Sequence, residues 1–167
     1  MELLLSENLP RQQSLSRCLE MLRTTTLKIG LPEDSSPRNR FLLSLHQRGS
    51  PIMRIPPRPF LAPALAGARE ELSSALASAC EAAQAGDESA VAAAFASAGE
   101  TGVAAIRQAI DDGLSPGNTA VTIHGGWIYN RPAGKSVYVE GKGFDKPLYH
   151  TGELYNAFTY QIKVNGS

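Results

Sequence analysis

The sequence predicts an α+β fold, in which two long alanine-rich helices pack on a small, mostly antiparallel sheet and an extended N-terminal segment precedes them. Apolar residues recur at helical spacing through residues 61–112, and they alternate with polar ones over residues 157–164. The 167 residues are 43% apolar and 19% charged, which is ordinary for a globular protein with one core. We therefore expect an N-terminal extension over residues 1–39 and one α+β domain over residues 40–167.

The first 39 residues carry one weak helical pattern. Apolar residues recur at spacings of three and four from Leu15 to Leu22, which predicts a short helix over about residues 11–25. Glycine and proline between Gly30 and Pro37 break the pattern, so a linker is expected there. An isolated helix of this length is unstable in water, so it must pack on its own core or on a neighbour.

Residues 40–59 predict a strand followed by a stiff arm. Phe41, Leu43 and Leu45 alternate with other side chains over Arg40–His46, which favours a strand, and Gly49-Ser50-Pro51 ends it. Four prolines between residues 51 and 59 hold the following segment extended and keep it out of the helical region.

Two long helices are expected next, from about Leu61 to Ala85 and from the N-cap Asp87 to about Asp112, ending at Gly86 and Gly113 respectively. Two glycines inside the second helix, Gly99 and Gly102, each cost about 1 kcal/mol relative to alanine and mark a candidate kink. The stripes expected to face the core are Phe60, Ala64, Ala68, Leu72, Leu76, Ala79 and Ala83 in the first helix, and Val91, Phe95, Ala98, Gly102, Ile106 and Ile110 in the second.

The C-terminal third predicts turns, a hairpin and a closing strand. After a Pro/Gly turn at residues 114–118, residues 120–130 and 137–140 are expected to form a hairpin that turns near residues 131–134. Thr151 is expected to cap a short helix that carries Leu154 into the core. The larger side chains expected in the core are Leu72, Leu76, Phe95, Ile106, Ile110, Phe158, Tyr160 and Ile162.

No motif in the sequence predicts catalysis, a metal or a cofactor. The histidines His46, His124 and His150 lie in separate segments without HxxxH or HExxH spacing, and neither GxxxxGK[ST] nor GxSxG is present. Cys18 and Cys80 form no metal or redox pair, so both are expected to be reduced thiols. A small hydrolase that uses His124 or His150 is kept as an alternative.

The formal net charge is zero, but the charges are unevenly distributed. Residues 1–59 carry nine basic and five acidic residues, residues 60–113 two and eight, and residues 114–167 five and three. This pattern is compatible with docking of a flank of one copy on the middle of another. A nucleic-acid-binding module that uses the basic flank is a second alternative. The apolar run at residues 1–5 is too short for a membrane span, so we expect a cytosolic protein without a membrane partner.

The order of several short motifs resembles the neck or tail-completion (virion-morphogenesis) proteins of long-tailed bacteriophages. The resemblance covers about residues 40–164, and its parts are His46–Pro51, the arm Ile55-Pro56-Pro57-Arg58-Pro59-Phe60-Leu61, the two helices, the turn Leu114–Asn118, Gly125–Asn130, Gly141–Gly143, and Lys146-Pro147-Leu148 with Thr151-Gly152 and Leu154 before the closing strand. The chain departs from the family in its longer first 39 residues and in His150 before the Thr-Gly pair.

The resemblance implies a structural virion protein rather than an enzyme. It implies a ring of six or twelve copies between the head connector and the tail-tube or tail-terminator proteins, assembled in the host cytoplasm, with genomic DNA passing through the lumen without sequence-specific binding. A tail terminator or a tailocin component is the alternative within this class. Arginine and aromatic residues are enriched at the energetic centres of interfaces. The candidates for subunit contacts are Arg54, Arg58 and Phe60 in the arm and Trp127 and Arg131 in the hairpin.

Overall fold

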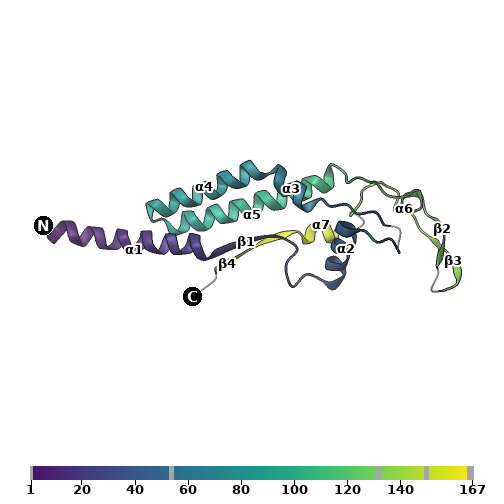
Figure 1. Cartoon of the computed structure of the whole chain (residues 1–167), viewed down its shortest axis with the longest axis horizontal. Coiled ribbons are helices and arrows are strands. Elements are labelled where there is room, and N and C mark those ends of the chain that lie inside the picture. The colour runs from purple at the N-terminus through teal and green to yellow at the C-terminus, as the bar shows by residue number, and fades with distance from the viewer. Residues whose placement is uncertain (1, 53–54, 131–132, 149–150, 165–167) are drawn as a thin grey trace. The chain divides into compact units, whose positions relative to one another are not determined.

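The computed structural model describes residues 2–52, 55–130, 133–148 and 151–164 (Figure 1). Side chains are described from Pro10 onward. Over these residues the chain has seven helices and two two-stranded antiparallel sheets, which confirms the α+β class. It divides into two compact units. Unit 1 comprises residues 1–34, 61–106 and 158–167, and unit 2 comprises residues 35–60 and 107–157. The N-terminal segment therefore belongs to the same unit as the two long helices.

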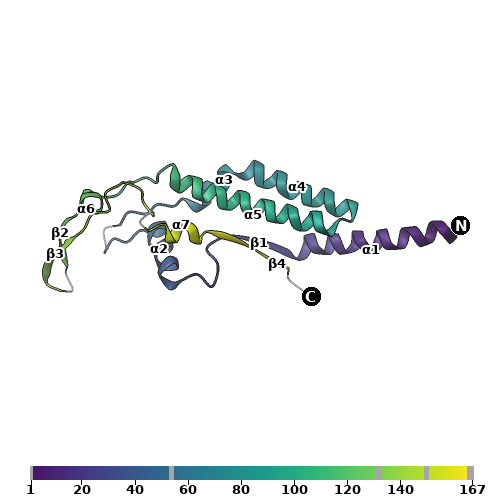
Figure 2. The same cartoon turned by 180° about the vertical axis from the view of Figure 1, so that it is seen from behind.

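Unit 1 is built from helices and one two-stranded sheet. Its elements are α1 (Glu2–Thr24), β1 (Thr25–Gly30), α3 (Leu61–Gly67), α4 (Arg69–Ala85), α5 (Glu88–Asp111) as far as Ile106, and β4 (Thr159–Val164). Figures 1 and 2 show α4 and α5 side by side, with the C-terminal half of α1 next to them. Their small side chains allow close packing, and the buried cluster consists of Cys18, Ala79, Ala83, Val91, Ala94 and Phe95.

Local signals set the ends of the long helices as predicted. Gly86 ends α4 in the left-handed conformation with φ 74°, and the side chain of Asp87 accepts a hydrogen bond from the backbone N–H of Ala90 at 2.9 Å. Gly113 follows α5 with φ 91°. The first helix is interrupted at Ala68, which separates α3 from α4, where one continuous helix was expected.

The predicted apolar stripe of α5 is confirmed, because its large members are buried. Val91, Ile106 and Ile110 have no exposed surface and Phe95 is 7% exposed. Among the described residues, α5 is the one helix long and apolar enough to cross a membrane. Its buried side forms the core of unit 1, and a core helix has the same composition.

Glycines in α5 allow the sheet to approach the helix closely, and α5 continues through them. A Cβ on Gly99 would lie 2.4 Å from the ring of Tyr160, and one on Gly102 would lie 2.5 Å from Cδ1 of Ile29. Distances below 3 Å require the neighbouring atoms to move, so a larger residue at either position would displace the ring of Tyr160 or the side chain of Ile29. The structure gives both glycines a packing role, and Gly102 was already expected on the stripe that faces the core.

Strand β1 lies between the predicted helix and the predicted linker, where no strand was expected. It pairs antiparallel with β4, so that Leu27 is opposite Ile162 and Ile29 is opposite Tyr160. The helix before it, α1, is also longer than the predicted helix at residues 11–25. A six-residue strand has little local signal, and its partner lies at the far end of the chain.

Burial in the closing strand is confirmed only near its beginning. Phe158 has no exposed surface and Tyr160 is half-buried, whereas Ile162 is 38% exposed. In α4, Leu72 is half-buried and Leu76 is 40% exposed. The prediction that Ile162 and Leu76 lie in the core is wrong. Ile162 lies in a sheet of only two strands, and Leu76 lies at the edge of the buried stripe of α4.

Unit 2 begins with a helix where a strand was predicted. Helix α2 (Pro37–Arg48) starts at Ser36, whose Oγ accepts a hydrogen bond from the backbone N–H of Asn39 at 3.1 Å, and Pro37 occupies the first turn. Gly49 ends it by donating its N–H to the carbonyl of Leu45 at 2.7 Å. The cap and the N-terminal proline favour a helix, and these signals outweigh the alternation that suggested a strand.

The remaining elements of unit 2 are short. They are α6 (Ala120–His124), the hairpin strands β2 (Gly126–Asn130) and β3 (Lys135–Val139), and α7 (Glu153–Ala157). The hairpin is confirmed, but residues 120–124 form a helix capped by Thr119 instead of extending the strand. The predicted cap of α7 is also present, since Thr151 Oγ1 accepts from the N–H of Glu153 at 3.4 Å and Leu154 is 5% exposed.

Candidate functional site

The proline-rich arm was expected to be extended throughout, but the chain turns at residues 51–52, and residues 56–60 have no regular secondary structure. The arm folds back on the end of α2. Ser50 and Ile55 exchange two backbone hydrogen bonds of 2.8 and 3.0 Å, which close a short loop. Further along, the N–H of Arg58 donates to the carbonyl of His46 at 2.6 Å. The arm is thereby attached to unit 2 by its own backbone.

The side chain of Arg58 lies inside unit 2 and connects three segments. Its guanidinium donates from Nε to the carbonyl of Pro116 at 2.5 Å and from Nη2 to the carbonyl of Gly117 at 2.8 Å. Nη1 lies 3.3 Å from Nδ1 of His46. Arg58 is 4% exposed, and this burial lowers its pKa while Asp145 opposes the shift. A planar fork with several donors suits such bridging of fixed acceptors.

Carboxylates hold the segment before α7 against the turn and the end of α5. Asp145 accepts from the backbone N–H and the side-chain amide of Asn118, at 2.7 and 2.9 Å. Asp111 accepts from Lys146 Nζ at 2.6 Å and from the hydroxyl of Tyr155 at 2.8 Å. These bonds lower the pKa of Asp111. Motifs that are distant in the sequence thus meet in one unit.

The burial of Arg58 and Phe60 corrects their assignment as surface contacts. Each is 4% exposed, so neither offers side-chain surface to a second copy. Proline restricts the backbone of the arm, and the hydrogen bonds of Arg58 attach the arm to the turn at Pro116 and Gly117. Both side chains therefore lie inside unit 2. Arg54 and Arg131 lie outside the described residues.

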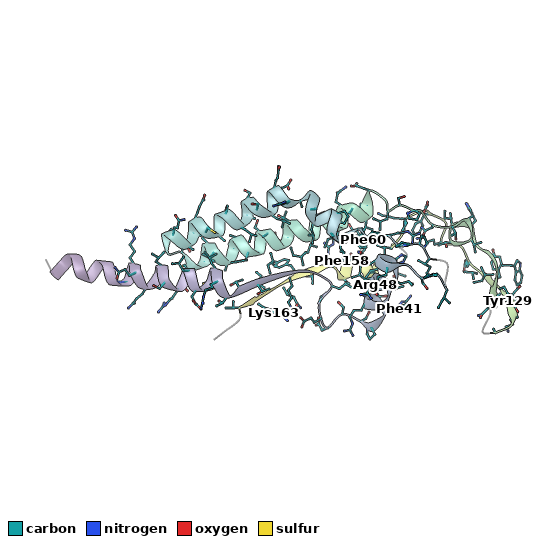
Figure 3. The ribbon with its side chains drawn as sticks, in the orientation of Figure 1. Phe41, Arg48, Phe60, Tyr129, Phe158 and Lys163 are labelled. Atoms are coloured by element: carbon teal, nitrogen blue, oxygen red, sulfur yellow. The ribbon has the colours of Figure 1, made fainter. Side chains whose placement is uncertain are left out.

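Trp127, by contrast, is 71% exposed and belongs to an uncovered surface of the β2–β3 hairpin. It lies directly opposite Tyr138 in the register, with ring centroids 5.7 Å apart in an edge-to-face arrangement. Tyr129, two residues further along β2, lies on the same face, and its side chain stands out from the hairpin in Figure 3. Tyr129 and Tyr138 are 65% and 59% exposed. We call these three residues the aromatic face.

Of these three residues, only Trp127 was predicted from the sequence to be a contact residue. The spacing of Trp127 and Tyr129 places them on one face of a strand, a signal that was available. The membership of Tyr138 depends on the register, which was not established by the sequence.

The base of the hairpin is anchored while the aromatic face is open. The N–H of Lys142 donates to the carbonyl of Thr122 at 3.0 Å, and the N–H of Gly143 donates to the carbonyl of Ile123 at 2.9 Å. A Cβ on Gly141 would lie 2.3 Å from the backbone nitrogen of Gly125, so the two backbones touch there. The segment Gly141–Gly143 therefore fixes the hairpin to α6.

Several titratable groups described in the structure are partners in hydrogen bonds or ion pairs. His124 is exposed in α6, and His150 lies outside the described residues. Glu33 accepts from Lys28 at 2.7 Å and from Lys163 at 3.0 Å, which lowers its pKa to about 2. Within the described ranges, no cluster of three or more His, Cys, Asp or Glu side chains is placed to hold a metal ion. The most distinctive surface in the described part is therefore the aromatic face.

Acidification is expected to destabilise the protein through His46. Burial, Arg58 and Lys142 lower the pKa of His46 from 6.5 to about 4. Above pH 6.5 the imidazole of His46 is neutral in both the folded and the unfolded protein, and the full stability is present. As the pH falls from 6.5 towards 4, the imidazole is protonated in the unfolded protein first, so the free energy of unfolding decreases. Because His46 is partly exposed, we expect the free energy of unfolding to decrease by about 1–3 kcal/mol.

Urea unfolding at pH 7 and pH 4.5 measures this effect, and His46→Asn is the control. The asparagine Oδ1 can accept from Arg58 in place of Nδ1 but does not titrate. The variant should lose less stability on acidification than the wild type. Protonation of Glu33 also lowers stability in acid, but by the same amount in both proteins. An equal loss in both proteins would contradict the assignment.

Comparison of the chain with known protein families, curated proteins and solved structures finds no match. The fold and the site define the class: an α+β protein that presents an anchored hairpin with exposed aromatic side chains.

Proposed function

We propose that the chain is a structural virion protein of a tailed bacteriophage, a ring-forming neck or tail-completion subunit that joins the head connector to the tail. The support from sequence is the resemblance in the order of motifs over about residues 40–164. A tail terminator or tailocin component is the alternative within the same class.

The observation that carries the proposal is the convergence of those motifs on Arg58. The arginine of the Ile-Pro-Pro-Arg-Pro-Phe arm bonds the turn at Pro116 and Gly117, 58 and 59 residues away, and contacts His46 before the Gly-Ser-Pro turn. Burying a guanidinium costs free energy. A charged group that is nevertheless buried is best known for making one conformation of the chain more favourable than its alternatives. The residues that resemble the family motifs therefore stabilise the fold of unit 2. Such a structural role suits a protein whose function is assembly.

Ring formation also requires surfaces that can meet. A cyclic ring of identical copies uses two different patches of each subunit. Exposed aromatic residues such as Trp127 and Tyr129 are the side chains that commonly anchor protein interfaces. The neutral net charge adds no overall repulsion between copies.

Mass measurement of the purified full chain tests the proposal. Native mass spectrometry should detect a closed assembly, of six or twelve copies if the resemblance holds, and negative-stain electron microscopy should reveal rings. Adding candidate head-connector and tail-tube proteins should yield larger complexes. Binding of duplex DNA should be weak and independent of sequence. A chain that remained monomeric at all concentrations and was absent from mature particles would overturn the proposal.

A further inference from the structure

His46, in the last turn of α2, contacts the arm through both its backbone and its side chain. Its carbonyl accepts the N–H of Arg58 at 2.6 Å, and Nδ1 of its imidazole lies 3.3 Å from Nη1 of Arg58. A Cβ on Gly49 would lie 2.7 Å from the backbone nitrogen of Pro57, so the two backbones are in direct contact just beyond the helix. These contacts attach the arm to the end of α2.

The side-chain contact requires the neutral form of His46. A guanidinium has N–H donors and no acceptor, so Nδ1 must be the acceptor and the ring proton must lie on Nε2. Protonation would place an N–H on Nδ1, facing an N–H of Arg58, and a positive charge beside the guanidinium. Because Nε and Nη2 of Arg58 donate to the carbonyls of Pro116 and Gly117, the guanidinium cannot turn away from the ring without losing those bonds.

The charges around His46 also favour the neutral imidazole. Burial, Arg58 of the arm and Lys142 of the segment after β3 all lower the pKa of His46. Asp145 acts on Arg58 and Lys142 and partly offsets their charges. Protonation of the imidazole is therefore opposed by charge as well as by hydrogen-bond geometry.

The remaining charged groups of α2 and of α7, which packs against it, do not change this balance. Helix α2 contains three exposed arginines and no acidic residue. In α7, Glu153 is exposed, so its charge is screened by solvent, and the hydroxyl of Tyr155 donates to Asp111.

We propose that His46 is a pH-sensitive switch: its neutral imidazole holds the arm on the end of α2, and its protonation releases the arm while the rest of the protein stays folded. Separation of the arm from α2 relieves the repulsion between imidazolium and guanidinium and lets water reach both groups. The switch acts as the pH falls from 6.5 towards 4, because the imidazole is protonated first in the released state. It operates within one copy and does not depend on ring formation.

Amide hydrogen exchange of the full chain, followed by NMR at pH 7.5 and pH 5, measures release of the arm. The N–H of Arg58 is the reporter, because the prolines on either side of it have no N–H. After correction for the intrinsic pH dependence of exchange, its protection should fall about tenfold at pH 5. An unchanged protection of this N–H would overturn the proposal.

Low concentrations of urea distinguish release of the arm from unfolding of the whole protein. Local opening exposes little surface, so exchange of the Arg58 N–H should be nearly independent of urea at both pH values. Exchange of the core amides of α4 should increase with urea. If the Arg58 N–H followed the same urea dependence as these core amides at pH 5, acid would unfold the chain as a whole and there would be no local switch.

Two histidine variants and the imidazole itself complete the test. His46→Asn keeps an acceptor for Arg58 but does not titrate, so its Arg58 N–H should stay protected at pH 5. His124→Asn, in exposed α6, is the matched control that should keep the tenfold response. An acid response in His46→Asn equal to that of the wild type would assign the effect to another group. In the wild type at pH 7.5, the imidazole ¹⁵N chemical shifts should show the proton on Nε2, and a proton on Nδ1 would contradict the switch without any substitution.

Discussion

Replacement of Arg58 by alanine is expected to lower the free energy of unfolding by about 1.5–3 kcal/mol. The substitution removes a buried guanidinium and leaves the carbonyls of Pro116 and Gly117 without their donors. It also removes the contact with His46. Because the arm, the turn and the end of α2 meet at this side chain, all three should loosen together. Chemical denaturation followed by circular dichroism measures the change.

Two further variants make this prediction specific. Arg58→Lys retains a charge but not the planar fork, so it should recover only part of the stability. Arg38→Ala, on the exposed side of α2, should change stability by no more than about 0.5 kcal/mol. If Arg58→Ala were as mild as Arg38→Ala, the buried network would not hold unit 2 together.

Replacement of Phe60 by alanine is expected to cost about 3–5 kcal/mol of stability, because its ring is 4% exposed and its removal leaves a cavity. From sequence, Phe60→Ala was expected to affect ring formation more than folding. The burial of Phe60 reverses that expectation, so the loss of assembly should follow the loss of folded protein. Thermal melts and native mass spectrometry of the same samples measure both quantities.

Trp127→Ala is the matched aromatic control for Phe60→Ala. Trp127 is 71% exposed, so its removal should change the folding free energy by about 0.5 kcal/mol or less. Phe60→Ala protein that melts like the wild type but fails to assemble would show that Phe60 acts at an interface after all.

Signals contained in a few neighbouring residues could be predicted well. The apolar stripe of α5, the cap at Asp87 and the stop at Gly86 each depend on spacing or on one backbone conformation. The cap of α7 at Thr151 is of the same kind. Such features are determined by local chemistry, and the structure confirms them.

The main error in the predicted secondary structure is the strand over residues 40–46, where two local signals compete. The alternation over residues 40–46 predicted a strand, but Ser36 and Pro37 provide a helix start just before it. Serine followed by proline is a helix-start signal that the sequence itself contains. For β1 no comparable signal exists, because Leu27 and Ile29 are stabilised by strand partners more than 130 residues away.

The candidate site was only partly predictable for the same reason. Trp127 was identified as an exposed contact residue, whereas Tyr138 joined it only once the hairpin register was known. Arg58 and Phe60 looked like contact residues because arginine and aromatic side chains are common at interfaces. Phe60 was also expected on the helix stripe that faces the core, and its burial confirms that expectation, whereas no residue near Arg58 in the sequence indicates burial.

The amino-acid sequence by itself determined the α+β class, the two long helices with their caps, and the hairpin, since helix and strand periodicity and capping act over a few residues. Only the tertiary structure decided which arginine and which aromatic residues are buried and why Gly99 and Gly102 are glycines. These properties depend on groups that meet across long stretches of chain: the carbonyls of Pro116 and Gly117 for Arg58, and the side chains of β1 and β4 for the two glycines.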